Sequence, residues 1–285
     1  MPVAAALTRI LSDLHYGDRA SRVDSLAQLS PLLAGVTHLV LNGDTLDTRP
    51  GPAPAHTARC LAEVRAFFPA RVPRVTFLTG NHDADLTADH AVDLAEGAVF
   101  VTHGDILHED IVPWSQDAGS IRPQIAAGLA ALPAAERAQL AARFAVWRRV
   151  AAAIPQRHQS ERHGLRYAIH FARDTVWPPT RVWGVIQTWR REPELAAAFL
   201  RHHRPQAQFI IVGHTHRPGA WSTRSGVVVI NTGSLCRPFG GCAVDLADNR
   251  LSVRRIVRRG RDFHAGAPIA AFSLADTGPS PKLSP

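Results

Sequence analysis

The stretch HLVLNGDTLD, residues 38–47, joins an apolar run to a glycine and two acidic side chains, Asp44 and Asp47. The same succession of an apolar run and a polar cluster occurs four more times. The runs lie at 7–11, 75–78, 98–101 and 208–212, and the clusters after them are SDLH (12–15), TGNHD (79–83), THGD (102–105) and GHTH (213–216). Helix-like stretches at 22–33 and 56–68 separate the first runs, and this alternation predicts an α/β sheet. Sites in such sheets lie just beyond the carboxyl ends of strands.

The pattern changes between about residues 107 and 204, where alanine-, arginine- and tryptophan-rich segments of helical period are broken by prolines. Strand-like runs return at 208–212, 227–230, 241–246 and 251–258. We therefore expect a core formed by residues 1–106 and 205–265, with residues 107–204 inserted into it as a helical cap. Residues 266–285 are rich in Ala, Pro, Ser and Gly without an amphipathic period, which predicts a flexible tail.

Composition narrows the class of protein. Hydrophobic residues make up 46% of the chain and charged residues 20%, and no apolar stretch is long enough to span a bilayer. Met1–Ser12 lacks the features of a signal peptide, and the three cysteines lack metal-type spacing, so we expect a cytoplasmic protein without a disulfide framework. A pairing of Cys236 with Cys242 stays an alternative. The net charge of +8 favours an anionic partner, which includes nucleic acid, an acidic membrane surface or a phosphorylated small molecule.

Two of the polar clusters hold pairs of metal-ligand residues at a spacing of two. Asp13 and His15 follow the first apolar run, and His214 and His216 follow the run at 208–212. The two-residue period of a strand predicts that both members of a pair turn to the same side, where they can share a cation. Each pair alone is also compatible with an ordinary surface loop.

The remaining clusters add carboxylate, amide and imidazole groups. Asp44 follows a glycine that permits a tight exit from the strand, and its carboxylate can bridge two metals. Asp47 is expected either to orient a metal-ligating histidine or to cap the following helix. Asn81 offers an amide oxygen, His103 offers a neutral nitrogen ligand, and His82 is the candidate general acid.

The conjunction of five such clusters, each directly after a predicted strand, indicates a metal centre. Mixed Asp, Asn and His ligands suit divalent manganese, iron or zinc. Two such ions about 3.5–4 Å apart lower the pKa of a bridging water towards about 7 and hold a phosphoryl oxygen during in-line attack. Hydrolysis of a phosphate ester or a pyrophosphate follows as the expected chemistry.

The order D-x-H, G-D-x-x-D, G-N-H-D, H-G-D and G-H-T-H between residues 13 and 216 resembles the calcineurin-like metallophosphoesterases. The resemblance implies a two-sheet α/β sandwich flanked by helices. It also implies two divalent metal ions bridged by Asp44, with His82 stabilising the phosphoryl transition state or protonating the leaving group. The implied ligands of one ion are Asp13, His15, Asp44 and His216, and those of the other are Asp44, Asn81, His103 and His214.

Within that superfamily, HGD followed by a helical insertion and then GHTHRP at 213–218 is most similar to the UDP-2,3-diacylglucosamine pyrophosphohydrolases. Those enzymes usually carry arginine where this chain has His82. The serine/threonine protein phosphatases fit less well, because their G-D-x-x-D-R-G and G-N-H-E motifs are not reproduced.

The predicted cap interleaves five tryptophans with arginines, and a surface of this composition can bind an anionic amphiphile. The tryptophans also fit the core of a small helical subdomain, with the arginines as its solvated face. Peripheral contact with the inner membrane surface through the cap is a further expectation. The alternative function is a nucleic-acid phosphodiesterase or nuclease that binds its substrate through the basic cap. The tryptophans are Trp114, Trp147, Trp177, Trp183 and Trp189.

Overall fold

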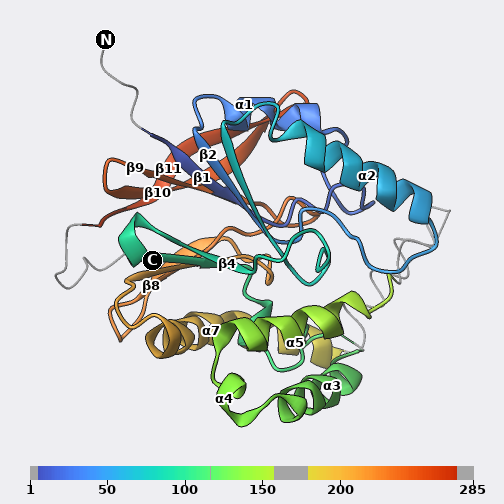
Figure 1. Cartoon of the computed structure of the whole chain (residues 1–285). Coiled ribbons are helices and arrows are strands. Elements are labelled where there is room, and N and C mark those ends of the chain that lie inside the picture. Colours follow the sequence, from blue (N-terminus) through green and yellow to red (C-terminus); the bar gives the residue numbers. More distant parts are fainter. Residues whose placement is uncertain (1–5, 116, 157–178, 275–285) are drawn as a thin grey trace.

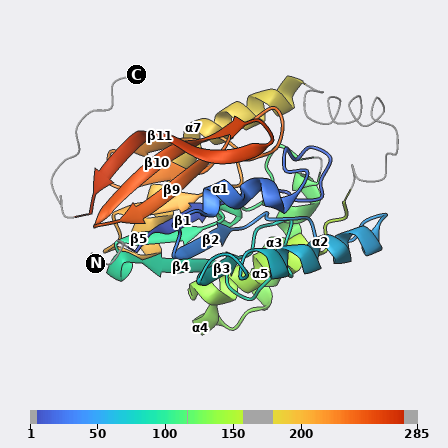
Figure 2. The ribbon, with the colours of Figure 1, turned by 90° about the horizontal axis from the view of Figure 1, so that it is seen from above.

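A computed structural model of the chain describes residues 6–115, 117–156 and 179–274. Two β-sheets stack on each other, with helices on the outer face of each (Figure 1). The six-stranded sheet has the order β11-β10-β9-β1-β2-β3, and Figure 2 shows these strands side by side. Its strands are β1 (Thr8–Leu11), β2 (His38–Asn42), β3 (Arg74–Leu78), β9 (Cys242–Ala247), β10 (Arg250–Arg259) and β11 (Asp262–Ser273). The predicted α/β sandwich flanked by helices is therefore confirmed.

The five-stranded sheet has the order β4-β5-β6-β8-β7. Its strands are β4 (Ala91–Leu94), β5 (Val99–Thr102), β6 (Phe209–Val212), β7 (Gly219–Ser222) and β8 (Val228–Asn231). β1, β2 and β3 are parallel in the first sheet, and β5, β6 and β8 are parallel in the second. Because parallel strands end at the same edge of a sheet, the polar clusters after these strands are brought together.

Successive strand residues face different layers of the core. Ile10 and Val40 point between the two sheets, where they pack with residues such as Ile211 of the second sheet. Leu11 and Leu39 point to the outer face of the first sheet. Because both faces are covered, these strands are continuously apolar in sequence, and burial of each such side chain contributes about 1.5–3 kcal/mol.

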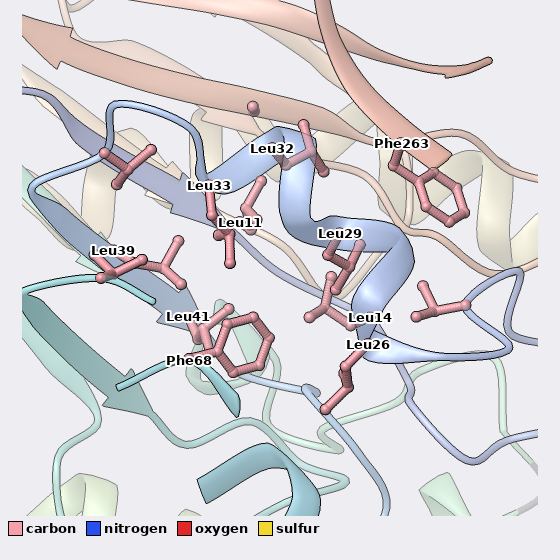
Figure 3. Packing of buried hydrophobic residues seen from close by; sticks show 14 of the residues in the cluster. Leu11, Leu14, Leu26, Leu29, Leu32, Leu33, Leu39, Leu41, Phe68 and Phe263 are labelled. Atoms are coloured by element: carbon pink, nitrogen blue, oxygen red, sulfur yellow. The ribbon is translucent and has the colours of Figure 1, made fainter. Parts of the chain in front are cut away.

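Short helices and α2 cover the outer face of the first sheet. The 3-10 helix η1 (Leu26–Leu29) runs directly into α1 (Ser30–Leu33), and their leucines pack over Leu11, Leu39 and Leu41 (Figure 3). Ser25 begins this segment with a capping box to Gln28, so the helical part starts later than the 22–33 predicted from sequence. α2 (Pro54–Phe67) adds Val64 to the same cluster.

The segment predicted as a helical cap contains η3 (Asp105–Leu107), α3 (Ala118–Ala131), α4 (Ala134–Arg137), α5 (Leu140–Ala152) and α7 (Pro179–His203). α3 and α5 share a cluster that includes Ile121, Ile125 and Trp147. The second half of α7 packs on the outer face of the second sheet, where Ala197 and Leu200 contact Ile210 and Val229. α7 therefore also covers the core. The division into core and cap stays a prediction.

The tryptophans of this segment have different environments. Trp147 is 2% exposed and belongs to the helical cluster, whereas Trp183 is 58% exposed. Trp114 and Trp189 line a cavity described below. Trp177 lies outside the described residues, as do Arg157, Arg162, Arg166 and Arg173.

The prediction that a flexible tail begins at residue 266 is wrong for residues 266–273. These residues form the second half of β11, which pairs antiparallel with β10. The strand was missed because it lies at the edge of the sheet, where its backbone pairs with β10 but its side chains show no clear hydrophobic alternation. Residues 275–285 lie outside the described part of the chain.

Two further observations bear on the sequence predictions. Cys60, Cys236 and Cys242 are free, so the alternative disulfide between the last two does not form. Among the helices of the described residues, none combines the length and the apolar character needed to cross a membrane.

Candidate metal centre

The predicted ligand side chains meet at the edge of the sandwich where β1, β2, β5 and β6 end. His15 Nε2 and His216 Nε2 lie 3.3 Å apart, and His216 Nε2 lies 3.1 Å from Asp13 Oδ1. Asp44 Oδ2 lies 3.3 Å from His103 Nε2 and 3.8 Å from His15 Nε2. Asp13, His15 and His216 form one group whose ligand atoms all lie within 4.8 Å, and Asp13, Asp44 and His103 form another. The two half-sets of ligands are therefore adjacent.

Asn81 Oδ1 and His103 Nε2 are among the buried atoms of the described residues that have no hydrogen-bond partner. Leaving a buried polar atom unpaired costs about 1–3 kcal/mol, so such atoms need an explanation. Both are good ligands for a divalent cation, and Asn81 lines the same cavity as Asp44 and His214. The residues present therefore fit the metal ions that the motifs imply.

Backbone carbonyls set which nitrogen of two histidines is free to bind a cation. His103 Nδ1 lies 3.0 Å from the carbonyl oxygen of Asn42, and His214 Nε2 lies 2.7 Å from that of Ile111. A carbonyl oxygen only accepts hydrogen bonds, so each of these nitrogens carries a hydrogen and donates the hydrogen bond. The other ring nitrogens, His103 Nε2 and His214 Nδ1, are left for a ligand.

Electrostatics within the cluster keeps its carboxylates charged. Burial alone would raise the pKa of Asp44, but the neighbouring His103 and His82 outweigh it and hold this pKa well below the ordinary value. Burial lowers the pKa of His15 to about 4, so its ring is neutral and able to bind a cation at neutral pH. Burial would also lower the pKa of His103, yet Asp44 raises it well above the ordinary value. In the absence of a cation, His103 therefore carries a proton that a bound metal would replace.

The two pairs of proposed ligands, Asp13 with His15 and His214 with His216, converge for a different reason from the one predicted. β1 ends at Leu11 and β6 ends at Val212, so the pairs lie beyond the regular strands. The side chains therefore meet because the backbone turns, and the argument from strand alternation was wrong. Five non-glycine residues here adopt the left-handed region, at a cost of about 1–2 kcal/mol each, and such strain is concentrated at functional sites. They are Asp13 (φ 51°), His15 (φ 46°), Asp44 (φ 49°), His214 (φ 66°) and His216 (φ 59°).

Asp83 is a residue of this site whose role was not predicted. It is fully buried, and its Oδ1 accepts hydrogen bonds from the backbone N–H groups of Asp44 (3.0 Å) and Gly80 (2.7 Å). Its Oδ2 accepts another from Thr45 N (2.7 Å). A Cβ atom at Gly80 would collide with the Asp44 carboxylate, so glycine is required for the two loops to approach. Asp83 thereby ties the loop after β3 to the loop after β2.

His82, the predicted acid, lies beside the cluster and is held by Asp47. His82 Nε2 is 4.0 Å from Asp44 Oδ2, and its Nδ1 is 3.0 Å from Asp47 Oδ2. Burial and Arg49 would lower the pKa of His82, but Asp44 and Asp47 raise it above the ordinary value. α2 begins at Pro54 with Ala53 as its N-cap, so Asp47 does not cap that helix. Asp47 instead contacts His82, which is not one of the proposed metal ligands.

Arg49 was also not predicted as a site residue. Its guanidinium donates to both carboxylate oxygens of Asp47, at 3.0 and 2.8 Å, and its side chain lines the cavity next to the centre. The paired geometry fixes the plane of the guanidinium. Arg49 lies two residues after Asp47 in GDTLDTR, which is the only signal that sequence offers for it.

A cavity of about 320 Å³ opens on the cluster. One part of its wall is polar and contains five of the seven proposed ligands, all except Asp13 and His103, together with His82 and Arg49. The rest of the wall is largely apolar and comes mainly from the inserted segment, and it includes Val112, Trp114, Ile121, Ile154, Val185 and Trp189. The cavity therefore offers polar groups beside an apolar surface.

Comparisons with known proteins agree with the motifs. The calcineurin-like phosphoesterase family matches residues 8–218, which include every proposed ligand. A UDP-2,3-diacylglucosamine hydrolase of Stenotrophomonas maltophilia (strain K279a) is 27% identical over 238 residues, covering 77% of this chain and 86% of that protein. A solved dimetal phosphatase from Danio rerio aligns over 96% of this chain and all of its own, with 14% identity and a TM-score of 0.47. Vacuolar protein sorting 29 from Cryptosporidium parvum covers 95% of this chain and all of its own, with 12% identity and a TM-score of 0.43.

The family match extends over most of the chain and confirms the resemblance seen in the motifs. The chain belongs to the calcineurin-like phosphoesterase family and is a metal-dependent hydrolase of phosphate esters or pyrophosphates.

Proposed function

We propose that the protein is a dinuclear enzyme that hydrolyses a phosphorylated amphiphile. Asp13, His15, Asp44 and His216 would hold one divalent cation, and Asp44, Asn81, His103 and His214 the other. The observation that carries this proposal is the adjacency of two ligand groups around Asp44, with Asn81 Oδ1 and His103 Nε2 buried and unpaired. When bound, two such ions lower the pKa of a shared water and neutralise charge on the phosphoryl group. Manganese, iron and zinc all suit these ligands.

His82 supplies the proton in this proposal. Its Nδ1 lies 3.0 Å from Asp47 Oδ2 and 2.8 Å from Arg49 Nη2, and these contacts leave Nε2 directed toward the cluster. Asp44 and Asp47 raise the pKa of His82 above the ordinary value, which favours its protonated form. His82 can therefore donate to the leaving oxygen, while Arg49, held by the same Asp47, offers N–H groups to the phosphate.

The lining of the cavity supports a substrate with an apolar part. Besides the proposed ligands, the apolar side chains of Val112, Ile154 and Val185 line it. The related protein from Stenotrophomonas maltophilia is named for UDP-2,3-diacylglucosamine, a nucleotide that carries two acyl chains. A substrate of this class would place its pyrophosphate at the cluster and its acyl chains against the apolar wall. The exposed Val182 and Trp183 on α7 support a further proposal of peripheral membrane contact in the cytoplasm.

Substrate preference tests the proposal. The manganese-loaded protein would be assayed with UDP-2,3-diacylglucosamine in detergent, a nucleotide sugar, bis(p-nitrophenyl) phosphate and single-stranded DNA. We expect the highest kcat/KM for the diacylated nucleotide. A preference for DNA that falls by orders of magnitude between low and moderate salt would instead support the nuclease alternative, because phosphate-backbone binding releases counterions.

A matched pair of variants tests the role of the apolar wall. Val185→Asp places a charge in the cavity, whereas Val182→Asp changes an exposed side chain of the same helix that does not line it. We expect Val185→Asp to lower kcat/KM for the diacylated nucleotide by about tenfold or more and that for bis(p-nitrophenyl) phosphate by less than about threefold. Val182→Asp should change neither in detergent. Equal losses on both substrates in Val185→Asp would contradict the assignment of this wall.

A further inference from the structure

Glu192 is a carboxylate buried in the middle of α7, and it is 1% exposed. Its two oxygens lie 3.0 and 2.8 Å from Thr215 Oγ1, and Oε1 also accepts a hydrogen bond from Asn231 Nδ2 at 2.9 Å. Burial raises the pKa of Glu192 to about 7, although the hydrogen bonds from Thr215 and Asn231 oppose this rise. A buried carboxylate is costly unless its partners compensate. The hydrogen bonds from Thr215 and Asn231 therefore stabilise the buried Glu192 carboxyl group.

The partner Thr215 lies between the proposed ligands His214 and His216. The backbone is left-handed at both histidines, with Thr215 N donating to Gly213 O at 2.7 Å. Both histidines line the cavity that opens on the metal cluster, whereas the Thr215 hydroxyl donates a hydrogen bond to Glu192 of α7. A rotation of this tight turn would move both imidazoles, so whatever fixes Thr215 also fixes them.

Several hydrogen bonds join this turn to its surroundings at the same point. Trp189 Nε1 donates to the Thr215 carbonyl oxygen at 2.8 Å, and Arg217 Nη1 donates to the Trp189 carbonyl oxygen at 2.7 Å. From β8, Asn231 Nδ2 lies 2.8 Å from Gly213 O and 2.9 Å from Thr215 Oγ1. The Glu192 carboxyl group is an acceptor in this network, which lies behind the turn that carries the two histidines.

We propose that Glu192 is a positioning residue that, through Thr215, holds His214 and His216 in the orientation in which they bind the cations. The inference rests on the proposed function, because it takes these histidines as ligands. Since α7 also lines the substrate cavity through Val185 and Trp189, the same helix joins the cavity wall to the metal centre. Partners of this kind behind metal ligands change metal affinity by about 10–100-fold when they are removed.

Three variants test this role. Glu192→Ala removes the acceptor, and Thr215→Val removes one hydroxyl while keeping the shape of the side chain. Glu194→Ala is the matched control, because Glu194 is exposed on the same helix. Manganese affinity of the metal-free protein would be measured by calorimetry, together with the unfolding temperature of the same samples. We expect both network variants to bind Mn²⁺ about 10–100-fold more weakly and the control to bind it as the wild type does.

The double variant Glu192→Ala, Thr215→Val should lose no more affinity than the stronger single variant, because both changes break one interaction. A lower unfolding temperature with unchanged Mn²⁺ affinity in both single variants would overturn the inference and leave the network a purely structural role. If Glu192→Ala does not fold, Thr215→Val decides alone. A wild type that binds no Mn²⁺ would refute the proposed function itself, which is a different result from equal binding by wild type and variants.

Discussion

At the scale of single residues, our proposal gives His82 a different role from the histidines that would bind metal. His82 lies within reach of Asp44, and its Nε2 could be taken for another ligand because it also groups with His15 and Asp44. Its Nδ1 is held by Asp47, and its pKa is raised rather than lowered. His15, in contrast, is kept neutral by burial. The contact of Nδ1 with Asp47 and the position of Nε2 beside Asp44 support our proposal that His82 donates the proton.

This assignment predicts different phenotypes for two neighbouring substitutions. His82→Ala should lower kcat on a model phosphodiester by about 10²–10⁴-fold while metal content stays nearly unchanged, since a proton donor acts in the transition state. Asp44→Ala should lose metal as well as activity. Metal content is measured by elemental analysis of the purified, dialysed proteins. Equal metal loss in the two variants would show that His82 is a ligand.

The proposed ligands could be found in the sequence because each closely follows an apolar run, so one short segment contains both the strand and the proposed ligand. Asp83, Arg49 and Glu192 could not be assigned in this way. Asp83 and Arg49 act through residues of other loops, and Glu192 meets Thr215 only because α7 packs against β6 and β8. A polar residue inside a helical pattern is ordinarily a solvated one, and no local signal marks Glu192 as buried.

At the scale of elements, a buried ion pair holds the centre of the six-stranded sheet. Arg9 of β1 lies opposite Asp245 of β9, and the guanidinium meets the carboxylate at 2.6 and 2.7 Å. Arg9 also donates to the carbonyl oxygen of Leu32 at the end of α1. The pair therefore connects β1, β9 and α1, and it lies in the strand that leads directly to Asp13.

Asp245→Ala should lower the free energy of unfolding by about 3–5 kcal/mol, because it leaves the charge of Arg9 buried without its partner. Arg254 also contacts Asp245, at 3.1 Å, but its side chain is 34% exposed. Arg254→Ala is the control and should cost less than about 1 kcal/mol. Urea unfolding of the metal-free proteins gives both values. Losses of similar, small size in the two variants would show that the pair is not important for the sheet.

Strands that are buried on both faces, such as β1, β2 and β6, were predicted from sequence because their apolar runs are uninterrupted. β4, β7 and β11 lie at the edges of the sheets and were missed or, for β11, taken as a tail. An edge strand is held by backbone hydrogen bonds on one side, and this leaves few constraints on its side chains. Similarly, α7 has both a cavity-lining part and a part that covers the second sheet, and helical period alone does not reveal that change.

At the scale of the whole molecule, stacking of the two sheets creates the site. Asp13, Asp44 and Asn81 follow strands of the first sheet, whereas His103 and His214 follow strands of the second. Neither sheet carries a complete ligand set for both cations. Two cations shared across this junction would also stabilise the stacked arrangement, since a ligand that binds only the folded state favours it.

The number of ions bound per chain is the most direct test of a shared centre, because a single ion could not use all seven proposed ligands in ordinary geometry. Metal-free protein would be titrated with Mn²⁺ and the bound metal measured at saturation, alongside hydrolysis of a model phosphodiester. For the proposed dinuclear centre, we expect close to two ions per chain, with activity that appears only as the second ion binds. A fully active protein that holds one ion per chain would contradict it.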